Sequence, residues 1–216
     1  MTNVKFEYIP VRECGEPLVD LSGQPFELEA AYFNQGLSND PALHARLQIV
    51  EKLIRIQTQL DGHRFRIWDP WRSRVVQGNI YQKLWDELAA EHPDWGEERL
   101  RVEVGKFITA ANNPNRIPPH ATGGAIDLTL VGPDGKELDM GTKFDHFGPE
   151  AASMYYEEAG RDTTIRDNRR LLREDMLSED FRHDDDEWWH YDFGNQLWAS
   201  AKGKSFAIYG EKTSAP

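Results

Sequence analysis

The sequence predicts a single domain that combines helices and strands, an α+β fold. Three segments carry apolar residues at the three- and four-residue spacing of helices, and three shorter segments alternate as strands do. No repeat and no Gly/Ser-rich linker divides the 216 residues. A chain of this length can bury one full hydrophobic core, so we treat residues 1–216 as one domain.

The composition restricts the partners and the compartment of the protein. A formal net charge of −12 disfavours nucleic acid and anionic membrane surfaces, because both reward clustered Lys and Arg. No stretch is apolar for long enough to span a bilayer, and residues 1–14 lack the apolar centre of a secretory signal. The single cysteine, Cys14, cannot form an internal disulfide, which agrees with a reducing compartment. We therefore expect a cytoplasmic protein without a nucleic-acid or membrane partner.

The first 60 residues are expected to contain short strands and one firm helix. Residues 1–35 are rich in turn-forming residues. Residues 38–41, Ser-Asn-Asp-Pro, then offer capping side chains and a proline suited to a first helical turn. Apolar residues follow at helical spacing, namely Leu43, Leu47, Val50 and Ile54. The pattern predicts a helix from this cap to about Leu60, with one face on the core.

A short buried strand is expected next, at residues 64–69. Phe65 and Ile67 alternate with arginines there, and an Asp-Pro pair ends the run. Arg72 therefore lies just beyond the end of a strand, where side chains often reach a functional site.

Two further core-facing helices are predicted before the chain breaks. The first spans Ser73 to about Ala90, and the second begins after Trp95. Their apolar stripes are Val76, Ile80, Leu84 and Leu88 in the first, and Leu100, Val104, Phe107 and Ile108 in the second. Asn and Pro residues at 112–119 then stop regular structure.

The segment at 125–131 predicts a strand with an acidic residue on its polar face. Period two separates Asp127 from the apolar side chains of Ile126, Leu128 and Leu130, which form the core face. His120 precedes Asp127 by seven residues, and two glycines between them allow the chain to fold back. We expect His120 and Asp127 to lie side by side.

A second strand, at 188–193, carries another histidine. Its alternation predicts Trp188, His190 and Asp192 on one face, and Glu187 can meet His190 only from a turn that precedes the strand. Two imidazoles, a carboxylate ligand and a further carboxylate match a catalytic zinc centre. The alternative is that each histidine is a hydrogen-bonded strand residue, which is the more frequent role of a single histidine.

Four segments resemble the D-alanyl-D-alanine dipeptidases of the VanX type. HATGGAID at 120–127 is similar to their H-x-x-G-x-A-x-D signature, and EWWH at 187–190 is similar to E-x-W-H. WDPWR at 68–72 and MGTKFD at 140–145 are similar to the segments D-x-Y-R-P and M-G-x-x-F-D of that family, in the same order. The first 60 residues match only loosely.

The resemblance implies a zinc peptidase with one Zn²⁺ per chain and a small dipeptide as substrate. It implies helices on an antiparallel sheet, as in D-Ala-D-Ala metallopeptidases and hedgehog-like domains. The residue roles that it implies are zinc ligation by His120, Asp127 and His190, general base catalysis by Glu187, oxyanion stabilisation by Arg72 and ammonium binding by Asp145.

The chain departs from the family at one substrate position. Pro118 occupies the place of a serine that helps to hold D-alanyl-D-alanine, and it has neither a hydroxyl group nor an N–H. Tyr32 is the nearest candidate for the family's substrate tyrosine. The substrate can therefore be a different small dipeptide or a D-amino-acid peptide. Two alternatives accompany the dipeptidase: a cell-wall peptidase of the same superfamily that acts on longer stem peptides, and a zinc-stabilised binding module without turnover.

Overall fold

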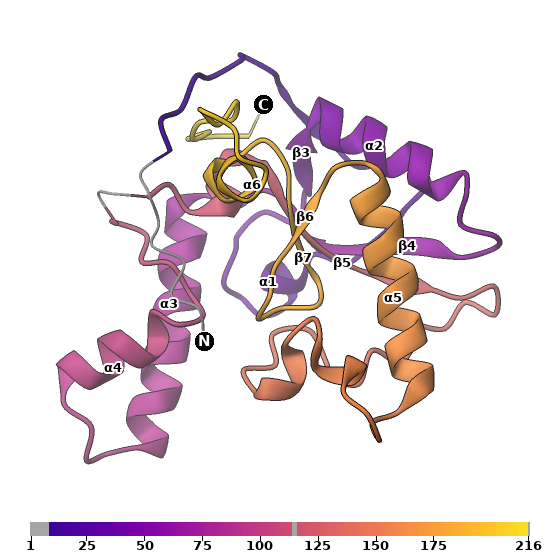
Figure 1. The fold of residues 1–216 in the computed structure, drawn as a ribbon. Helices are drawn as coiled ribbons and strands as arrows, with labels where there is room; N and C mark the ends of the chain where they lie inside the picture. The colour runs from indigo at the N-terminus through magenta and orange to yellow at the C-terminus, as the bar shows by residue number, and fades with distance from the viewer. Residues whose placement is uncertain (1–8, 114–115, 216) are drawn as a thin grey trace.

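A computed structural model describes residues 9–113 and 116–215 and has an α+β fold (Figure 1). A five-stranded sheet has the strand order β2-β4-β5-β7-β6, and β1 and β3 form a separate two-stranded sheet. The strands are β1 (Leu18–Asp20), β2 (Glu27–Leu28), β3 (His44–Arg46), β4 (Arg64–Asp69), β5 (Ala125–Val131), β6 (Arg182–His183) and β7 (His190–Asp192). The helices are α1 (Ala31–Asn34), α2 (Leu47–Gln57), α3 (Arg74–Glu91), α4 (Glu97–Val104), α5 (Thr163–Ser178) and α6 (Gln196–Ala201).

The main sheet is antiparallel except at one edge. The pairs β4–β5, β5–β7 and β6–β7 are antiparallel, as expected, whereas β2 pairs with β4 in parallel. The antiparallel sheet that the resemblance implies is therefore present in β4, β5, β7 and β6, and β2 adds a parallel strand at one edge. A parallel pair needs a long crossover, and α1, β3 and α2 supply it between these two strands.

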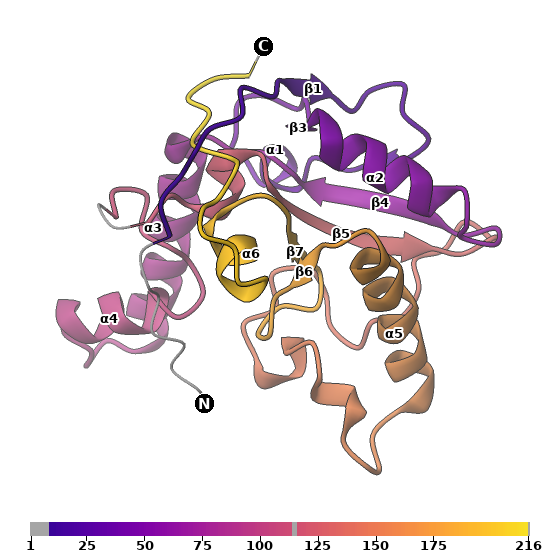
Figure 2. The ribbon, with the colours of Figure 1, turned by 45° about the horizontal axis from the view of Figure 1, so that its top comes forward.

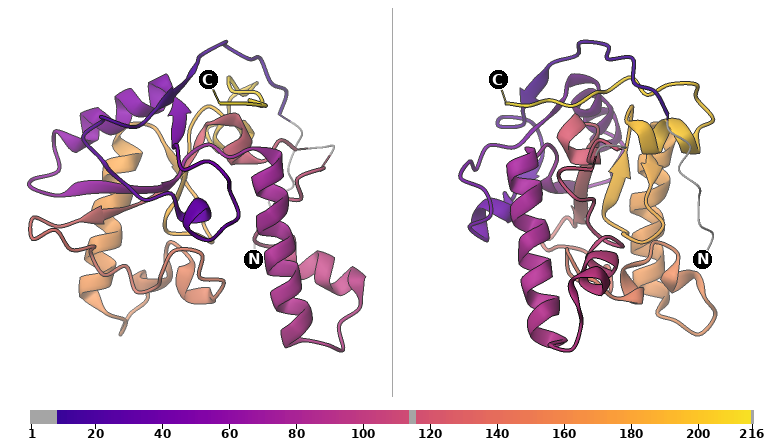
Figure 3. Two further views of the ribbon diagram at one scale, coloured as in Figure 1. Left: turned by 180° about the vertical axis from the view of Figure 1, so that it is seen from behind. Right: turned by 90° about the vertical axis from the view of Figure 1, so that its left-hand side faces the viewer.

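The core lies on one face of this sheet. Helices α2 and α5 contact each other and share one apolar cluster with β4 and β5 (Figure 2). Ile126, Leu128 and Leu130 of β5 belong to that cluster, which confirms the predicted core face of this strand. Helices α3 and α4 form a smaller cluster together with Tyr32 of α1 and with Ile108. Helices α3 and α5 lie on opposite sides of the central strands (Figure 3).

The predicted helix after Ser38 begins later than expected. Residues 44–46 pair with β1 as strand β3, and α2 starts only at Leu47. The Asp40 side chain accepts a hydrogen bond from the Ala42 N–H at 2.9 Å, so it closes a local turn instead of capping a helix. The prediction that residues 38–41 cap this helix is therefore wrong, because residues 44–46 pair with β1 and the N-cap of α2 is Arg46.

The other predicted elements are found with small changes at their ends. Helix α3 has Ser73 as its N-cap, and β4 and β5 span the predicted strands. Helix α4 ends at Val104, so Phe107 and Ile108 lie beyond it. Of the two segments predicted to be irregular, residues 1–8 and residues 114–115 lie outside the described part of the chain.

The strand predicted at 188–193 is shorter, because β7 spans only His190–Asp192. The Asp184 N–H donates to the His190 carbonyl, and the His190 N–H donates to the Glu187 carbonyl at 3.3 Å. The chain therefore reverses between β6 and β7. Trp188 lies in this turn and not on the strand face, whereas Glu187 precedes the strand as expected.

Among the residues that the structure describes, no helix combines the length and the apolar character needed to cross a membrane.

A fully buried arginine joins four distant segments of the chain. The Arg46 guanidinium donates to the carboxylate of Glu13 and to the carbonyl oxygens of Glu16, Thr122 and Gly210, at 2.5–2.9 Å. Because Thr122 closely follows His120 in the chain, this arginine also supports the segment that carries the histidine.

We expect Arg46→Met to destabilise the protein by roughly 3–5 kcal/mol, because it leaves buried carbonyl groups and a carboxylate without their donor. The matched control is Arg64→Met. Arg64 also pairs with a glutamate, but its side chain is 54% exposed, so its loss should cost roughly 1 kcal/mol or less. Urea unfolding measures both. Equal losses for the two variants would contradict the anchoring role of Arg46.

Candidate metal centre

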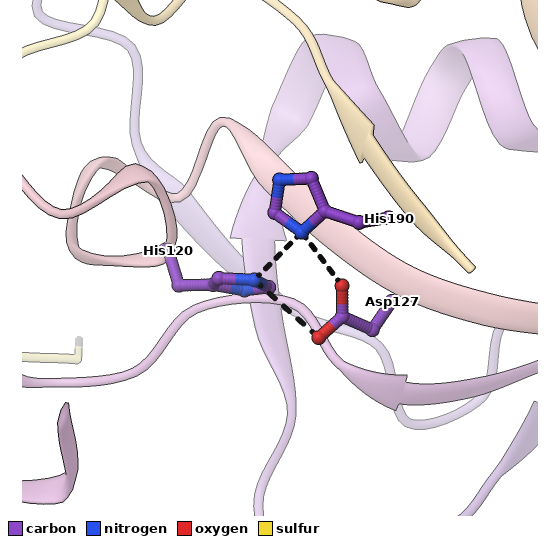
Figure 4. Close-up of side chains that lie close together, drawn as sticks. All are labelled: His120, Asp127 and His190. Carbon is purple, nitrogen blue, oxygen red and sulfur yellow. Dashed lines mark hydrogen bonds and ion pairs between the residues drawn. The ribbon is translucent and has the colours of Figure 1, made fainter. Parts of the chain in front are cut away.

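Three side chains from separate segments converge on one point (Figure 4). His120 lies in a short 3-10 helix (Pro119–Thr122), Asp127 lies in β5 and His190 lies in β7. One potential ligand atom of each lies within 4.8 Å of the others, and the three residues are 2%, 3% and 6% exposed. His120 is therefore not a strand residue, and the two histidines share one cluster with Asp127.

Strand pairing positions two of the three. Asp127 and His190 are direct partners in the antiparallel pair β5–β7, and Asp127 Oδ1 lies 2.9 Å from His190 Nδ1. Side chains opposite each other in such a pair lie on the same face of the sheet. The sheet register alone therefore brings this carboxylate and this imidazole together.

Two glycines bring His120 to the same point, as predicted. Gly123 ends the 3-10 helix in the left-handed region, with φ of 70°. A Cβ atom at Gly124 would lie 2.5 Å from the Phe193 carbonyl oxygen, so only glycine fits there. His120 Nε2 consequently lies 3.4 Å from Asp127 Oδ2 and 3.2 Å from His190 Nδ1.

The outward ring nitrogens of both histidines face acceptors. His120 Nδ1 lies 2.8 Å from the Pro70 carbonyl oxygen and 3.1 Å from Asp69 Oδ2. His190 Nε2 lies 3.2 Å from Asp192 Oδ1. Such acceptors hold a proton on the outward nitrogen and direct the lone pair of the inward nitrogen to a metal ion. The arrangement is typical of metal-binding histidines.

Asp127 is suited to be the anionic ligand. Burial by itself raises the pKa of a carboxyl group, but His120 and His190 more than offset this and hold the pKa of Asp127 well below its ordinary value. Two imidazoles and one carboxylate form a donor set that catalytic zinc uses, with a fourth position left for water. The residues present therefore fit Zn²⁺.

Glu187 lies beside the three converging side chains without joining them. Its Oε2 is 3.9 Å from His190 Nδ1, and 23% of its side-chain surface is exposed to solvent. Burial raises the pKa of Glu187 well above its ordinary value, and the charge of Asp127 adds to the effect, although His190 opposes it. A carboxyl group with a raised pKa can both accept and return a proton near neutral pH.

Arg72 is held rigidly at the edge of the same site. Its Nη1 donates to Asp69 Oδ2 at 2.6 Å, its Nε donates to Gln77 Oε1 at 2.8 Å, and its guanidinium lies 5.2 Å from the centre of the Tyr32 ring. Burial alone would lower the pKa of Arg72, but the surrounding carboxylates, Asp69 first among them, raise it. A permanent positive charge is therefore fixed in position.

Asp145 forms an acidic end of the site together with a tyrosine. The Tyr32 hydroxyl donates to Asp145 Oδ1 at 3.1 Å. Burial, and secondly the charge of Asp127, raise the pKa of Asp145 to about 7. A cation that bound beside it would lower this pKa and ionise the group. Tyr32, the candidate substrate tyrosine, is thus found next to the candidate ammonium-binding residue.

All six predicted site residues line one cavity of about 310 Å³. They are Arg72, His120, Asp127, Asp145, Glu187 and His190. This volume is at the lower end of the range for small-molecule sites, roughly 300–1,000 Å³.

Three supporting residues were missed from the sequence. Asp69 contacts both Arg72 and His120, Gln77 fixes Arg72, and Asp192 contacts His190. Asp192 had a detectable signal, because period two puts it on the same strand face as His190. Gln77 had none, since it lies among the polar residues of a helix.

Comparison with known proteins gives a consistent family match. A family model described as D-ala-D-ala dipeptidase matches residues 45–207, which include all six predicted site residues. The chain is 28% identical to a D-alanyl-D-alanine dipeptidase of Synechocystis sp., over 88% of this chain and 87% of that protein. It is 38% identical to one of Enterococcus faecalis, over 60% of this chain and 62% of that protein. Among solved structures, VanYB in complex with D-Alanine-D-Alanine covers 91% of this chain and is itself covered over 93%, with a TM-score of 0.48 and 14% identity.

We expect purified protein to hold about one zinc ion per chain, and His190→Ala to lose most of it, because two donors cannot replace three. His183→Ala is the matched control, since His183 lies on the neighbouring strand and pairs with Tyr191 instead of facing the centre. Elemental analysis of dialysed protein measures both. Zinc retention by the His190 variant would contradict this ligand set.

Proposed function

The chain belongs to the D-ala-D-ala dipeptidase family, and with this premise we propose that it hydrolyses D-alanyl-D-alanine or a related small dipeptide in a zinc-dependent reaction. One observation carries the proposal. A potential zinc-binding triad, a carboxyl group with a raised pKa, a fixed arginine and a half-buried acidic end line a single small cavity. A binding module would need the triad but neither Glu187 nor Arg72.

We assign the zinc ligands to His120 Nε2, His190 Nδ1 and the Asp127 carboxylate. Bound there, the metal would lower the pKa of a coordinated water and polarise the scissile carbonyl group. The hydrogen bonds to Pro70, Asp69 and Asp192 orient the two imidazoles before any metal arrives. The protein therefore supplies a preorganised site.

Glu187 is the proposed general base. Its carboxylate borders the inward nitrogen of His190 but lies outside the three-ligand cluster, so it is free to move a proton. It would take the proton of the attacking water at a carboxylate oxygen and deliver it to the nitrogen of the departing amine. The raised pKa supports both halves of this transfer.

Arg72 is the proposed partner of the negative charge that develops on the carbonyl oxygen. Its guanidinium is already fixed by Asp69, Gln77 and Tyr32, so little reorganisation accompanies the reaction. Preorganised charge in a buried site is among the largest contributions to catalysis.

Asp145 and Tyr32 are the proposed binding site for the free amino group of the substrate. The half-buried carboxyl group of Asp145 gains a counter-ion when an ammonium group binds, and the Tyr32 hydroxyl orients the carboxyl group. Phe107 and Phe147 are in ring contact at 5.1 Å and line the same cavity, which favours short substrates. Pro118 replaces the family serine, so a related dipeptide remains part of the proposal.

We also propose a cytoplasmic location, supported by the exposed free thiol of Cys14.

Glu187→Gln should retain zinc and lose roughly 10²- to 10⁴-fold in kcat, because it removes the proton acceptor but no ligand. Asp185→Asn, which alters an acidic neighbour with a side chain 81% exposed, should leave kcat unchanged. Zinc content and dipeptide hydrolysis are measured on the same preparations. If zinc disappears together with activity, Glu187 is a ligand and the assignment is wrong.

Acetylation of the amino end of a good dipeptide should reduce kcat/KM at least ~100-fold, because it leaves the Asp145 carboxyl group buried without its cation, a cost of roughly 2–5 kcal/mol. Asp145→Asn should narrow the difference between free and acetylated substrates, mainly by slowing the free one. Equal rates on free dipeptides, acetylated dipeptides and long stem peptides would instead favour the cell-wall endopeptidase.

A further inference from the structure

His190 lies between two carboxylates that compete for its ring proton. Asp127 Oδ1 is 2.9 Å from Nδ1, and Asp192 Oδ1 is 3.2 Å from Nε2. A neutral imidazole carries one proton, and only a proton on Nε2 leaves the Nδ1 lone pair available to a metal ion. Something must therefore favour Asp192 as the acceptor.

We propose that Asp192, clamped by Arg182 and Asn195, is a positioning residue that holds the proton of His190 on Nε2 and directs Nδ1 to the metal. The inference rests on the proposed role of His190 as a zinc ligand. It adds an outer cluster of residues on which metal binding depends.

Asp192 is fully buried and accepts hydrogen bonds from three side chains. Its Oδ1 faces His190 Nε2 and also accepts from Asn195 Nδ2 at 2.5 Å, while its Oδ2 accepts from Arg182 Nη1 at 2.7 Å. A carboxylate fixed at both oxygens cannot rotate away from the imidazole.

A helix cap fixes the orientation of Asn195. Asn195 is the N-cap of α6, and its Oδ1 accepts from the Trp198 N–H at 3.0 Å. The amide oxygen is thereby committed to the helix, so the NH₂ group must face Asp192. Reversal of this amide would lose the cap and place two acceptors against each other.

Arg182 reaches Asp192 from the neighbouring strand. The two residues are direct partners in the antiparallel pair β6–β7. The same Nη1 atom also contacts Asp184 Oδ2 at 3.0 Å, and the arginine side chain is 18% exposed. The cation thus offsets part of the charge of the buried Asp192 carboxylate. Strands β6 and β7 and helix α6 all contribute to holding one imidazole.

Asp192→Asn tests the clamp with almost no change in shape. The new amide oxygen should stay beside the Arg182 cation, because the reverse orientation would set an NH₂ group against the guanidinium. The NH₂ group then faces His190 Nε2, and the Asn195 NH₂ group loses its acceptor. Nε2 must then accept a hydrogen bond, the ring proton moves to Nδ1, and metal ligation is opposed. We expect zinc affinity to fall about 10- to 100-fold, the usual effect of losing an outer-shell partner.

The measurement is the zinc dissociation constant, obtained by chelator competition without any peptide present. Ring-nitrogen NMR of the zinc-loaded protein supplies a second readout, in which the wild type should show a slowly exchanging His190 Nε2–H proton and Asp192→Asn should not. Asp185→Asn is the matched control and should bind zinc like the wild type. An Asp192→Asn variant that folds and binds zinc with wild-type affinity overturns the inference.

Arg182→Met and Arg182→Lys provide a test that keeps Asp192 intact. Methionine should weaken zinc binding, and lysine should restore part of it because it retains the cation. If Asp192→Asn does not fold, the two Arg182 variants test the inference instead. Wild-type zinc affinity in Arg182→Met would then contradict the proposed role of Asp192. A wild-type protein that binds zinc but hydrolyses no dipeptide would overturn the proposed function and leave the clamp standing.

Discussion

The antiparallel pairing of β5 with β7 is the constraint on which the site depends. It sets Asp127 directly opposite His190, and the same register puts Ile126 and Tyr191 on the core face. A slip of one residue would exchange the two faces along the strand, burying the carboxylate in the core and exposing apolar side chains. The hydrophobic effect therefore enforces the register, and the metal-binding geometry follows from it.

The buried charges that support the two histidines are each paired with an opposite charge. Each supporting carboxylate contacts both a histidine and an arginine: Asp69 joins His120 to Arg72, and Asp192 joins His190 to Arg182. A buried ion without a partner destabilises the folded protein. Loss of one side chain from either group would therefore leave the remaining charges unpaired. The two halves of the site are in this sense built alike, although they come from different elements.

The sequence was most informative where local periodicity coincided with tertiary structure. Alternation along 125–131 predicted both the core face and the outlying Asp127, and the two glycines predicted the return of His120. Helix α5 escaped notice because its buried positions, Arg169, Leu172 and Met176, are dispersed among charged residues. Strand β3 could not be found either, since it depends on pairing with β1 across the intervening β2 and α1. The pair Arg182–Asp192 was missed because β6 spans only Arg182–His183 and is too short to show an alternating pattern. The roles of the site residues were reached through family resemblance rather than through spacing.

The Arg46 anchor bears on how the folding unit is delimited. The family match covers residues 45–207. The Arg46 guanidinium, however, pairs with the Glu13 carboxylate and donates a hydrogen bond to the Gly210 carbonyl oxygen, and both partners lie outside that range. A polypeptide trimmed to residues 45–207 would keep every proposed catalytic side chain. It would also leave the Arg46 cation buried without its carboxylate partner. The segments that complete the Arg46 cluster therefore lie on both sides of the range that the family model matches.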